Sequence, residues 1–378
     1  MRIAVLKETE PGEARVALVP ESVKRLIGKQ HTVVVARGAG DASLYSDDEY
    51  KAAGAEIADD AAKDADLVLT IQATAAGGGE RLKEGAALIG LLSPMTNKAL
   101  VQALAAKKVT AMAVEFIPRT TLAQMMDVLS SQTNIAGYRA VIMAAEASPR
   151  LFPMLMTAAG TIAPAKVLIL GAGVAGLQAI ATAKRLGAVV EAFDARKVVK
   201  EQVESLGAKF VMVDSTEDAQ TASGYAQELS EEYKQKQAAL IGEHVQKSDV
   251  VITTANIPGR KAPVLVTAAM AAKMRRGSVI IDLAAETGGN CELTKAGETV
   301  VEKGVRIIGA RNLPSQAPVH ASQMYARNME KLIAHLCTKN GKATAAMELD
   351  LGEEITKAIV VTHSGAVVNE RVKEAVAK

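Results

Sequence analysis

The segment 166–196 places a strand, a glycine-rich turn, a helix and a second strand in direct succession. An apolar run at 167–170 leads into Gly171, Gly173 and Gly176, and an alanine-rich helical stretch follows. In this order the first glycine permits a tight turn, the second lets the backbone approach a pyrophosphate, and the third lets the helix pack on the strand. The free N–H groups and positive dipole end of the helix then face the phosphates. The segment predicts a parallel α/β sheet with a dinucleotide site at this turn; the alternative is a glycine-rich turn that binds nothing.

Asp194 ends the second strand of this segment, about 20 residues beyond Gly171. A carboxylate at this place accepts hydrogen bonds from the adenosine ribose and repels a 2′-phosphate, which favours NAD over NADP. Arg196 and Lys197 follow at once and can also embrace a 2′-phosphate, so NADP stays open as an alternative.

Length and composition limit the number of domains and the fold class. A chain of 378 residues is long enough for two domains, each burying most of its apolar surface. Hydrophobic residues make up 49% of the chain and aromatic residues only 3%, as in parallel sheets covered by small-residue helices. A net charge of +2 supplies no field that recruits nucleic acid. Cys291 and Cys337 stand in no metal-ligand spacing, so we expect reduced thiols and no metal site.

The sequence also bears on membrane contact. No uninterrupted run of about 18 apolar residues is present, because prolines, Gly160 and Lys166 break the richest stretch at 151–170. The N-terminus turns charged within its first eight residues and lacks the core of a signal peptide. We therefore expect a cytoplasmic protein without direct membrane insertion.

Two series of buried strands alternate with helices along the chain. The first series has helices at 20–28 and 97–107 and predicted strands at 2–6, 32–36, 66–71, 87–92 and 109–115. The second series resembles a full double mononucleotide-binding fold, with six predicted strands at 166–170, 189–193, 209–213, 249–254, 278–283 and 305–308. The predicted fold is α/β, with two doubly wound parallel-sheet domains, the second a Rossmann domain.

Two long helical stretches, 127–147 and 320–337, are predicted to connect the domains. The chain would then return to the first domain and end in a strand pair at 355–362 and 365–368. The predicted division is a flavodoxin-like domain, 1–126 plus 338–378, and a Rossmann domain with the connector helices, 127–337.

Two segments, 73–80 and 214–236, look mobile from their composition. The second carries Gly224 and Tyr225 in polar surroundings. A tyrosine beside a glycine in a polar loop is exposed by default, and the functional alternative is a lid that closes over a bound nucleotide.

Four segments together resemble the NAD(H)-binding first domain of proton-translocating nicotinamide nucleotide transhydrogenase, in the form where this domain is a separate alpha subunit. They read PRTTLAQMMDVLSSQTNIAGYRAV, GAGVAGLQAIATAKRLGAVVEAFDAR, TTANIPGRKAPVLVT and GSVIIDLAAETGGNCE. The match runs essentially from Met1 to the C-terminus. A relative, alanine dehydrogenase, shares the fold and the opening seen here as Lys7-Glu8 and 15–20.

The resemblance implies which residues bind the nucleotide and act in the reaction. At the nicotinamide end it places Arg119, Gln124, Met125, Met126, Asp127 and Ser130. Elsewhere it places Val174 by the pyrophosphate, Asp194, Ala195 and Arg196 at the adenosine, and Gly224, Tyr225, Gln237 and Asn256 around the loop and the switch-point strand. The catalytic set would be Arg119, Gln124, Asp127, Ser130 and Tyr225.

The spacing of three between Gln124, Asp127 and Ser130 would put them on one face if this segment opens the connector helix. Arg119 can then donate to the carboxamide oxygen, and Asp127 can orient Arg119. A helix-capping and salt-bridge cluster is the structural alternative.

The two related families differ in their need for a proton. Alanine dehydrogenase uses a lysine and a histidine as acid and base, and the corresponding positions here carry Thr70 and Ser93. Hydride exchange between two nicotinamide rings needs no such pair. The resemblance therefore implies direct transfer between NAD(H) on this chain and NADP(H) on a partner subunit, coupled to proton translocation by membrane-spanning subunits.

The same resemblance implies a homodimer, peripheral on the cytoplasmic face of the inner (plasma) membrane through its partner subunits. An alanine-dehydrogenase-like enzyme and a non-catalytic NAD(H)-sensing protein remain as alternatives.

Overall fold

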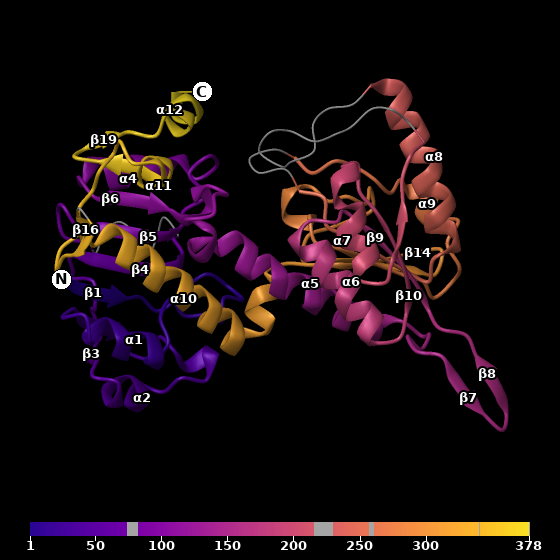
Figure 1. Cartoon of the computed structure of the whole chain (residues 1–378), viewed down its shortest axis with the longest axis horizontal. Helices are drawn as coiled ribbons and strands as arrows, with labels where there is room; N and C mark the ends of the chain where they lie inside the picture. The colour runs from indigo at the N-terminus through magenta and orange to yellow at the C-terminus, as the bar shows by residue number, and fades with distance from the viewer. Residues whose placement is uncertain (74–81, 215–229, 257–260, 340, 378) are drawn as a thin grey trace. The chain divides into compact units, whose positions relative to one another are not determined.

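The chain forms two compact units in the computed structural model, which describes residues 1–378 except 74–81, 215–229, 257–260, 340 and 378 (Figure 1). Unit 1 comprises Met1–Gln132 and Pro314–Lys378, and unit 2 comprises Thr133–Leu313. Each unit holds one large, mainly parallel sheet, which confirms the predicted α/β class with two domains. Among the described residues, no helix combines the length and the apolarity that crossing a membrane requires.

Unit 1 contains an eight-stranded sheet in the order β19-β18-β6-β5-β4-β1-β2-β3. Its strands are β1 (Arg2–Val5), β2 (Thr32–Ala36), β3 (Glu56–Ala58), β4 (Leu67–Gln72), β5 (Ala87–Leu91), β6 (Thr110–Ala113), β18 (Val360–His363) and β19 (Ala366–Val367). Strands β1 to β6 are parallel, and β18 and β19 extend the sheet antiparallel. Because β2 and β4 lie on opposite sides of β1, the order of the strands reverses there. The carboxyl ends of β1 and β4 consequently border a crevice of the kind that binds ligands in such sheets.

The remaining elements of unit 1 cover this sheet and connect its strands. Its helices are α1 (Pro20–Ile27), α2 (Asp47–Ala52), α4 (Lys98–Ala106), α10 (Pro318–Leu336), α11 (Glu354–Ile359) and α12 (Glu370–Ala377), with short 3-10 helices η1 (Asp41–Ser43), η2 (Val114–Phe116), η3 (Gln124–Met126) and η6 (Leu313–Gln316). A small hairpin joins β16 (Thr338–Lys339) to β17 (Lys342–Ala343). Helix α5 (Val128–Ala147) runs from unit 1 into unit 2.

Unit 2 contains a seven-stranded sheet in the order β11-β10-β9-β12-β13-β15-β14. Its strands are β9 (Lys166–Leu170), β10 (Val189–Phe193), β11 (Lys209–Val211), β12 (Val250–Thr253), β13 (Val279–Asp282), β14 (Thr299–Glu302) and β15 (Val305–Gly309). Its helices are α6 (Val174–Arg185), α7 (Lys200–Ser205), α8 (Glu231–Lys247) and α9 (Ala268–Ala271), with 3-10 helices η4 (Lys197–Val199) and η5 (Ala285–Thr287). The six parallel strands follow the order of a Rossmann domain, as predicted.

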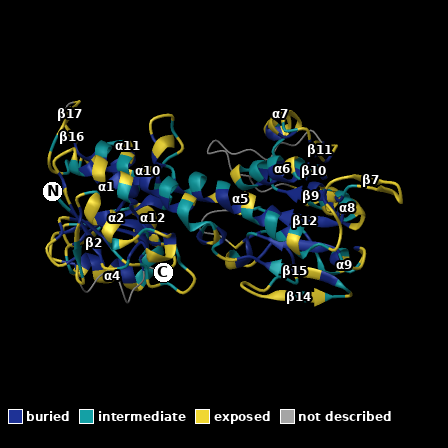
Figure 2. Ribbon diagram, turned by 90° about the horizontal axis from the view of Figure 1, so that it is seen from below, coloured by how far each residue is buried: buried dark blue, intermediate teal, exposed yellow. Residues whose placement is uncertain are grey.

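The sheet of unit 2 is buried on both faces. Along β9, Val167 and Ile169 pack into one apolar cluster, whereas Leu168 and Leu170 pack into another. A parallel strand covered by helices on both sides reads as a continuous apolar run, which is why it was recognisable in the sequence. Figure 2 shows β9 and β12 as mostly buried, whereas β14 at the edge of the sheet is half exposed.

The C-terminal strand pair is predicted too long. Residues 354–359 form helix α11, because the Glu353 side chain accepts hydrogen bonds from the backbone N–H groups of Ile355 and Thr356 and caps the helix. The strand β18 begins only at Val360. The hairpin that follows is present as expected, with Ser364 and Gly365 in its turn at positive φ.

Helix α10 belongs to unit 1, although the prediction assigned it to the second domain. Its residues Tyr325, Met329 and Leu332 are fully buried in the core of unit 1. The Tyr325 hydroxyl also donates to the carbonyl of Thr70 at 2.7 Å. The compact units therefore divide at 132/133 and 313/314 instead of 126/127 and 337/338.

Candidate dinucleotide site

The glycine-rich turn has the geometry that its sequence predicts. Gly171 has a φ of +102°, which favours glycine. A Cβ on Gly176 would collide with the carbonyl oxygen of Gly171, so the third glycine is needed for the helix to approach the strand. A Cβ on Gly173 would meet nothing within 4 Å. Gly173 is the N-cap residue of α6, so this open space lies at the N-terminus of the helix.

The carboxylate of Asp194 fixes this turn from the end of β10. Its Oδ2 atom accepts a hydrogen bond from Ala172 N–H at 2.7 Å, and Oδ1 accepts from Arg196 N–H at 2.9 Å. The Arg196 guanidinium donates to both oxygens, at 2.9 and 2.8 Å, and this pairing raises the pKa of Arg196. Asp194 is 8% exposed, and these hydrogen bonds fix the orientation of its carboxylate beside the turn.

The adjacent strand end is held by a buried amide that the sequence did not single out. The Asn290 side chain donates to the carbonyls of Ala255 and Pro263, both at 2.8 Å, and accepts from Ala255 N–H at 3.0 Å. Asp282 accepts in turn from Asn290 N–H at 2.7 Å. Asn290 thereby positions the segment after β12 at the switch point of the sheet. The signal in the sequence is a polar GGNCE stretch after a buried strand.

The other predicted residues of unit 2 lie around this turn with different exposure. Val174 is the first residue of α6 and is exposed, and Ala195 directly follows Asp194. Gln237 lies half-buried on α8, and exposed Asn256 accepts a hydrogen bond from Thr287 at 3.3 Å. Gly224 and Tyr225 lie outside the described residues, as do most of the predicted lid and of the segment 73–80.

The residues predicted for the nicotinamide end lie in unit 1, between the loop before η3 and the first turn of α5. Arg119, Gln124 and Met125 are exposed, whereas Met126 is buried. Helix α5 begins after Asp127, so the predicted shared helix face is wrong for Gln124, which belongs to the preceding 3-10 turn.

Asp127 caps α5. Its Oδ1 atom accepts from Ser130 N–H at 2.9 Å, and its Oδ2 atom accepts from the Ser130 hydroxyl. The capping alternative is therefore realised for this pair, and it sets the direction in which the carboxylate of Asp127 points.

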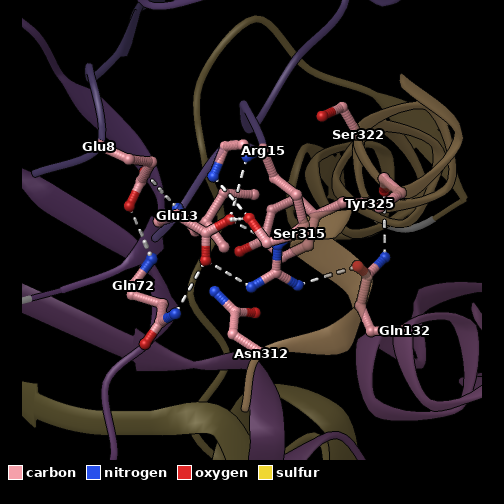
Figure 3. A network of polar contacts seen from close by, with 12 residues as sticks. Glu8, Glu13, Arg15, Gln72, Gln132, Asn312, Ser315, Ser322 and Tyr325 are labelled. Atoms are coloured by element: carbon pink, nitrogen blue, oxygen red, sulfur yellow. Dashed lines mark hydrogen bonds and ion pairs between the residues drawn. The ribbon is translucent and has the colours of Figure 1, made fainter. Parts of the chain in front are cut away.

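A second polar cluster lies at the carboxyl ends of β1 and β4 in unit 1 (Figure 3). Arg15 donates to Glu13 through Nε at 2.7 Å and through Nη2 at 2.6 Å, and it donates to Gln132 through Nη1 at 2.9 Å. Gln72 also donates to Glu13, at 2.8 Å. Burial acts to raise the pKa of Glu13, but the hydrogen bonds and charge of Arg15 outweigh it and lower the pKa to about 2. The positive charge of Arg15 is thus balanced within the cluster.

Two carboxylates whose charged forms burial disfavours engage Thr70 and Ser93 in unit 1. Glu8 accepts from the Thr70 hydroxyl at 2.7 Å, and Glu115 accepts from Ser93 N–H at 2.6 Å. Burial raises the pKa of both Glu8 and Glu115 to about 7. The cavity beside Glu8 has a volume of about 130 Å³, which is small for a nucleotide.

Comparison with known proteins identifies two matching family models. The alanine dehydrogenase/PNT N-terminal domain matches residues 4–136, and the alanine dehydrogenase/PNT C-terminal domain matches residues 140–370. The chain is 50% identical over 379 residues to an NAD(P) transhydrogenase subunit alpha chain of Rhodospirillum rubrum, covering 98% of each protein.

Solved structures agree with these matches. The crystal structure of transhydrogenase from Sinorhizobium meliloti superposes with a TM-score of 0.89 at 46% identity, covering 97% of this chain and 100% of the other. An L-alanine dehydrogenase structure superposes with a TM-score of 0.83 at 25% identity, covering 99% of both chains.

Proposed function

This chain belongs to the alanine dehydrogenase/PNT family, and we propose that it is the NAD(H)-binding subunit of a proton-translocating transhydrogenase. It would exchange hydride directly with NADP(H) held by a partner subunit. The observation that carries this proposal is that Thr70 and Ser93, which the resemblance aligns with the acid and base of alanine dehydrogenase, are a threonine and a serine, each bonded to a carboxylate. A site without that pair suits a reaction that moves no proton.

The residues of unit 2 account for nucleotide binding in this proposal. The turn at Gly173 and the N-terminus of α6 receive the pyrophosphate. Asp194, already aligned by Ala172 and Arg196, accepts hydrogen bonds from the adenosine ribose and disfavours a 2′-phosphate. NAD is therefore the nucleotide that we assign to this chain.

The residues of unit 1 account for orientation at the nicotinamide end. NADH, when bound, supplies a hydride from C4 of its nicotinamide ring. Arg119 donates to the carboxamide oxygen, and Gln124 contacts a ribose or bridges to the second nucleotide. Asp127 and Ser130, fixed to each other as a helix cap, hold this loop in place. The protein's contribution is then to position the rings and to exclude water.

Membrane-spanning partner subunits would couple this exchange to proton translocation and hold the chain at the cytoplasmic face of the membrane. We also propose a homodimer. The apolar β7–β8 hairpin of unit 2, β7 (Leu155–Thr157) and β8 (Gly160–Ile162), is the surface that we assign to the second copy.

An isotope experiment tests the proposed function. The purified chain is mixed with NADH deuterated at C4 and with a transhydrogenase NADP-binding domain that holds an oxidised NADP analogue. We expect deuterium in the reduced analogue and no label from deuterated water when the NADH is unlabelled. Solvent label in the product contradicts direct transfer. Brisk reduction of pyruvate with ammonia by this chain alone supports an alanine-dehydrogenase-like enzyme, and NADH binding without any transfer supports a sensor.

A further inference from the structure

The 3-10 helix η3 is joined to α10 by one buried amide. Asn328, on α10, is 7% exposed, and its Nδ2 atom donates to the carbonyl oxygen of Met125 at 2.9 Å. Its Oδ1 atom accepts from the Ser131 hydroxyl on α5 at 2.7 Å. The amide thus connects the loop that precedes α5 with the first turn of that helix, entirely within unit 1.

This connection continues into the acid and arginine cluster. Gln132 donates to the Ser131 hydroxyl at 3.3 Å and to the carbonyl of Ala321 on α10 at 3.1 Å. The side-chain oxygen of Gln132 accepts from Arg15, which is itself held by Glu13. Figure 3 shows the Arg15 and Gln132 portion of this network. A continuous series of hydrogen bonds therefore runs from Glu13 to the carbonyl of Met125.

Within the loop, the backbone N–H groups of Ala123 and Gln124 donate to the carbonyl of Thr120, at 3.1 and 3.0 Å. A 3-10 helix of three residues makes few internal hydrogen bonds, so its position depends on outside contacts. Met126 and Ala123 are buried, which fixes the inner side, whereas Met125 is 54% exposed and Gln124 is exposed. The donor and acceptor of Asn328 match the carbonyl of Met125 and the hydroxyl of Ser131 at once, and a carboxylate of the same size offers no donor.

We propose that Asn328 is a positioning residue for hydride exchange. It touches no reacting atom, and it acts by fixing the backbone at Met125 and with it Gln124 on one side and Asp127 on the other. This inference rests on the proposed function, because it assigns a purpose to the placement of those two residues. A misplacement of about 1 Å at reacting groups costs on the order of 100-fold in rate, so a loop anchor of this kind affects the rate of transfer more than binding.

The test compares two Asn328 variants with a matched control on the same helix. Asn328→Asp keeps the size and an acceptor but loses the donor, and Asn328→Leu loses both. Gln323→Leu removes another amide of α10, which donates to the Tyr45 hydroxyl at 3.1 Å instead of to η3. Single-turnover transfer to the NADP-binding domain is measured beside the dissociation constant of NADH.

For both Asn328 variants we expect transfer to slow by about 10- to 100-fold, with the NADH dissociation constant changed less than about threefold. Ser131→Ala, which keeps the bond to Met125, should slow transfer less than either, and Gln323→Leu should leave it unchanged. A folded Asn328→Leu protein with the wild-type rate overturns the proposal. An equal loss in Gln323→Leu also overturns it, because the effect is then a general consequence of disturbing α10.

A spectroscopic readout on the folded variants separates this inference from the proposed function. The methyl signals of Met125 and Met126 are followed by NMR of methionine-labelled protein and assigned with Met125→Leu. We expect the Met125 signal to shift and narrow in Asn328→Asp and, to a smaller extent, in Ser131→Ala. If the wild type fails to transfer hydride, the proposed function is wrong, while the NMR result still decides whether Asn328 anchors the loop. Unchanged methyl signals in all folded variants refute the anchor.

Discussion

Asp194 makes two kinds of contact through one carboxylate, one to the glycine-rich turn and one to Arg196. In the proposed site, nucleotide choice would therefore depend on a carboxylate whose orientation these contacts already fix. The sequence leaves two alternatives open here: NAD, favoured by Asp194, and NADP, favoured by Arg196 and Lys197. In the structure the guanidinium of Arg196 is paired with Asp194, and this pairing favours the NAD alternative.

Asp194→Ala is expected to weaken NADH binding by about 10- to 100-fold, the worth of a charge-assisted hydrogen bond of roughly 1.5–3 kcal/mol. It should weaken NADPH binding much less, because Arg196 is then released toward a 2′-phosphate. Titration of both nucleotides measures this, and Asp194→Asn is the control that keeps an acceptor for Ala172. An unchanged ratio of the two affinities means that the ribose is held elsewhere.

The buried carboxyls Glu8 and Glu115 make stability depend on pH. Because burial raises the pKa of each from 4.5 to about 7, their contribution is fully present below pH 4.5 and is lost as the pH rises through 7. Glu13 and Glu353 act in the opposite sense, since their pKa values are lowered to about 2 and their contribution is lost as the pH falls from 4.5 toward 2.

We therefore expect the free energy of unfolding to rise as the pH is lowered from 8 to 5, by up to about 1.4 kcal/mol per pH unit for each of Glu8 and Glu115. Glu8→Gln, which keeps an acceptor for the backbone of β4, should flatten that slope. Urea denaturation at pH 5, 6, 7 and 8 provides the measurement. A slope that is equally steep in Glu8→Gln shows that Glu8 does not titrate in this range.

The turn between β9 and α6 shows how two glycines in one motif serve different ends. A side chain at Gly176 would collide with the carbonyl of Gly171, whereas one at Gly173 would meet no atom of the chain, so in the proposed site Gly173 would leave room for the pyrophosphate. Substitution of Gly176 should therefore lower the stability of unit 2, and substitution of Gly173 should weaken NADH binding.

Gly176→Ala should destabilise unit 2 by about 1–3 kcal/mol, because the added methyl meets the carbonyl of Gly171. Gly173→Ala should keep the melting temperature and yet weaken NADH binding by at least about tenfold, or ~1.4 kcal/mol. Thermal denaturation and NADH titration of both variants measure this. If Gly173→Ala binds NADH like the wild type, the pyrophosphate does not lie against this turn.

The hairpin β7–β8 exposes apolar side chains that a lone molecule leaves in water. Met156 is 76% exposed, Ile162 50% and Leu155 41%, and the two strands pair with each other in a sheet of their own. A lone two-stranded ribbon is marginally stable in water, so contact with a second copy would stabilise it.

Met156→Glu should raise the dissociation constant of the homodimer by at least about tenfold, or ~1.4 kcal/mol, because a charge would have to be buried at the contact. Sedimentation velocity over a concentration series measures it. Val301→Glu on β14, where Val301 is 64% exposed, is the control in the same unit and should leave the dimer intact. A Met156→Glu protein that dimerises like the wild type places the interface elsewhere.

The sequence by itself determined the two α/β series, the Rossmann class of the second series and the glycine-rich turn. Local sterics and burial decide these features. A glycine that takes a positive φ, or a buried strand that reads as a four-residue apolar run, can therefore be recognised from consecutive residues of the sequence. Strand β14 and helix α11 were harder to predict from the sequence, because β14 is half exposed and α11 depends on the capping carboxylate of Glu353.

Only the tertiary structure decided which polar groups meet. Asn290 reaches Ala255 from 35 positions away, and Asn328 reaches Met125 from 203 positions away. Arg15 could be noted in the opening motif, but its partner Gln132 lies 117 positions along the chain. Hydrogen bonds of this kind leave no periodicity in the sequence, since each is specified by how distant elements pack and not by neighbouring residues.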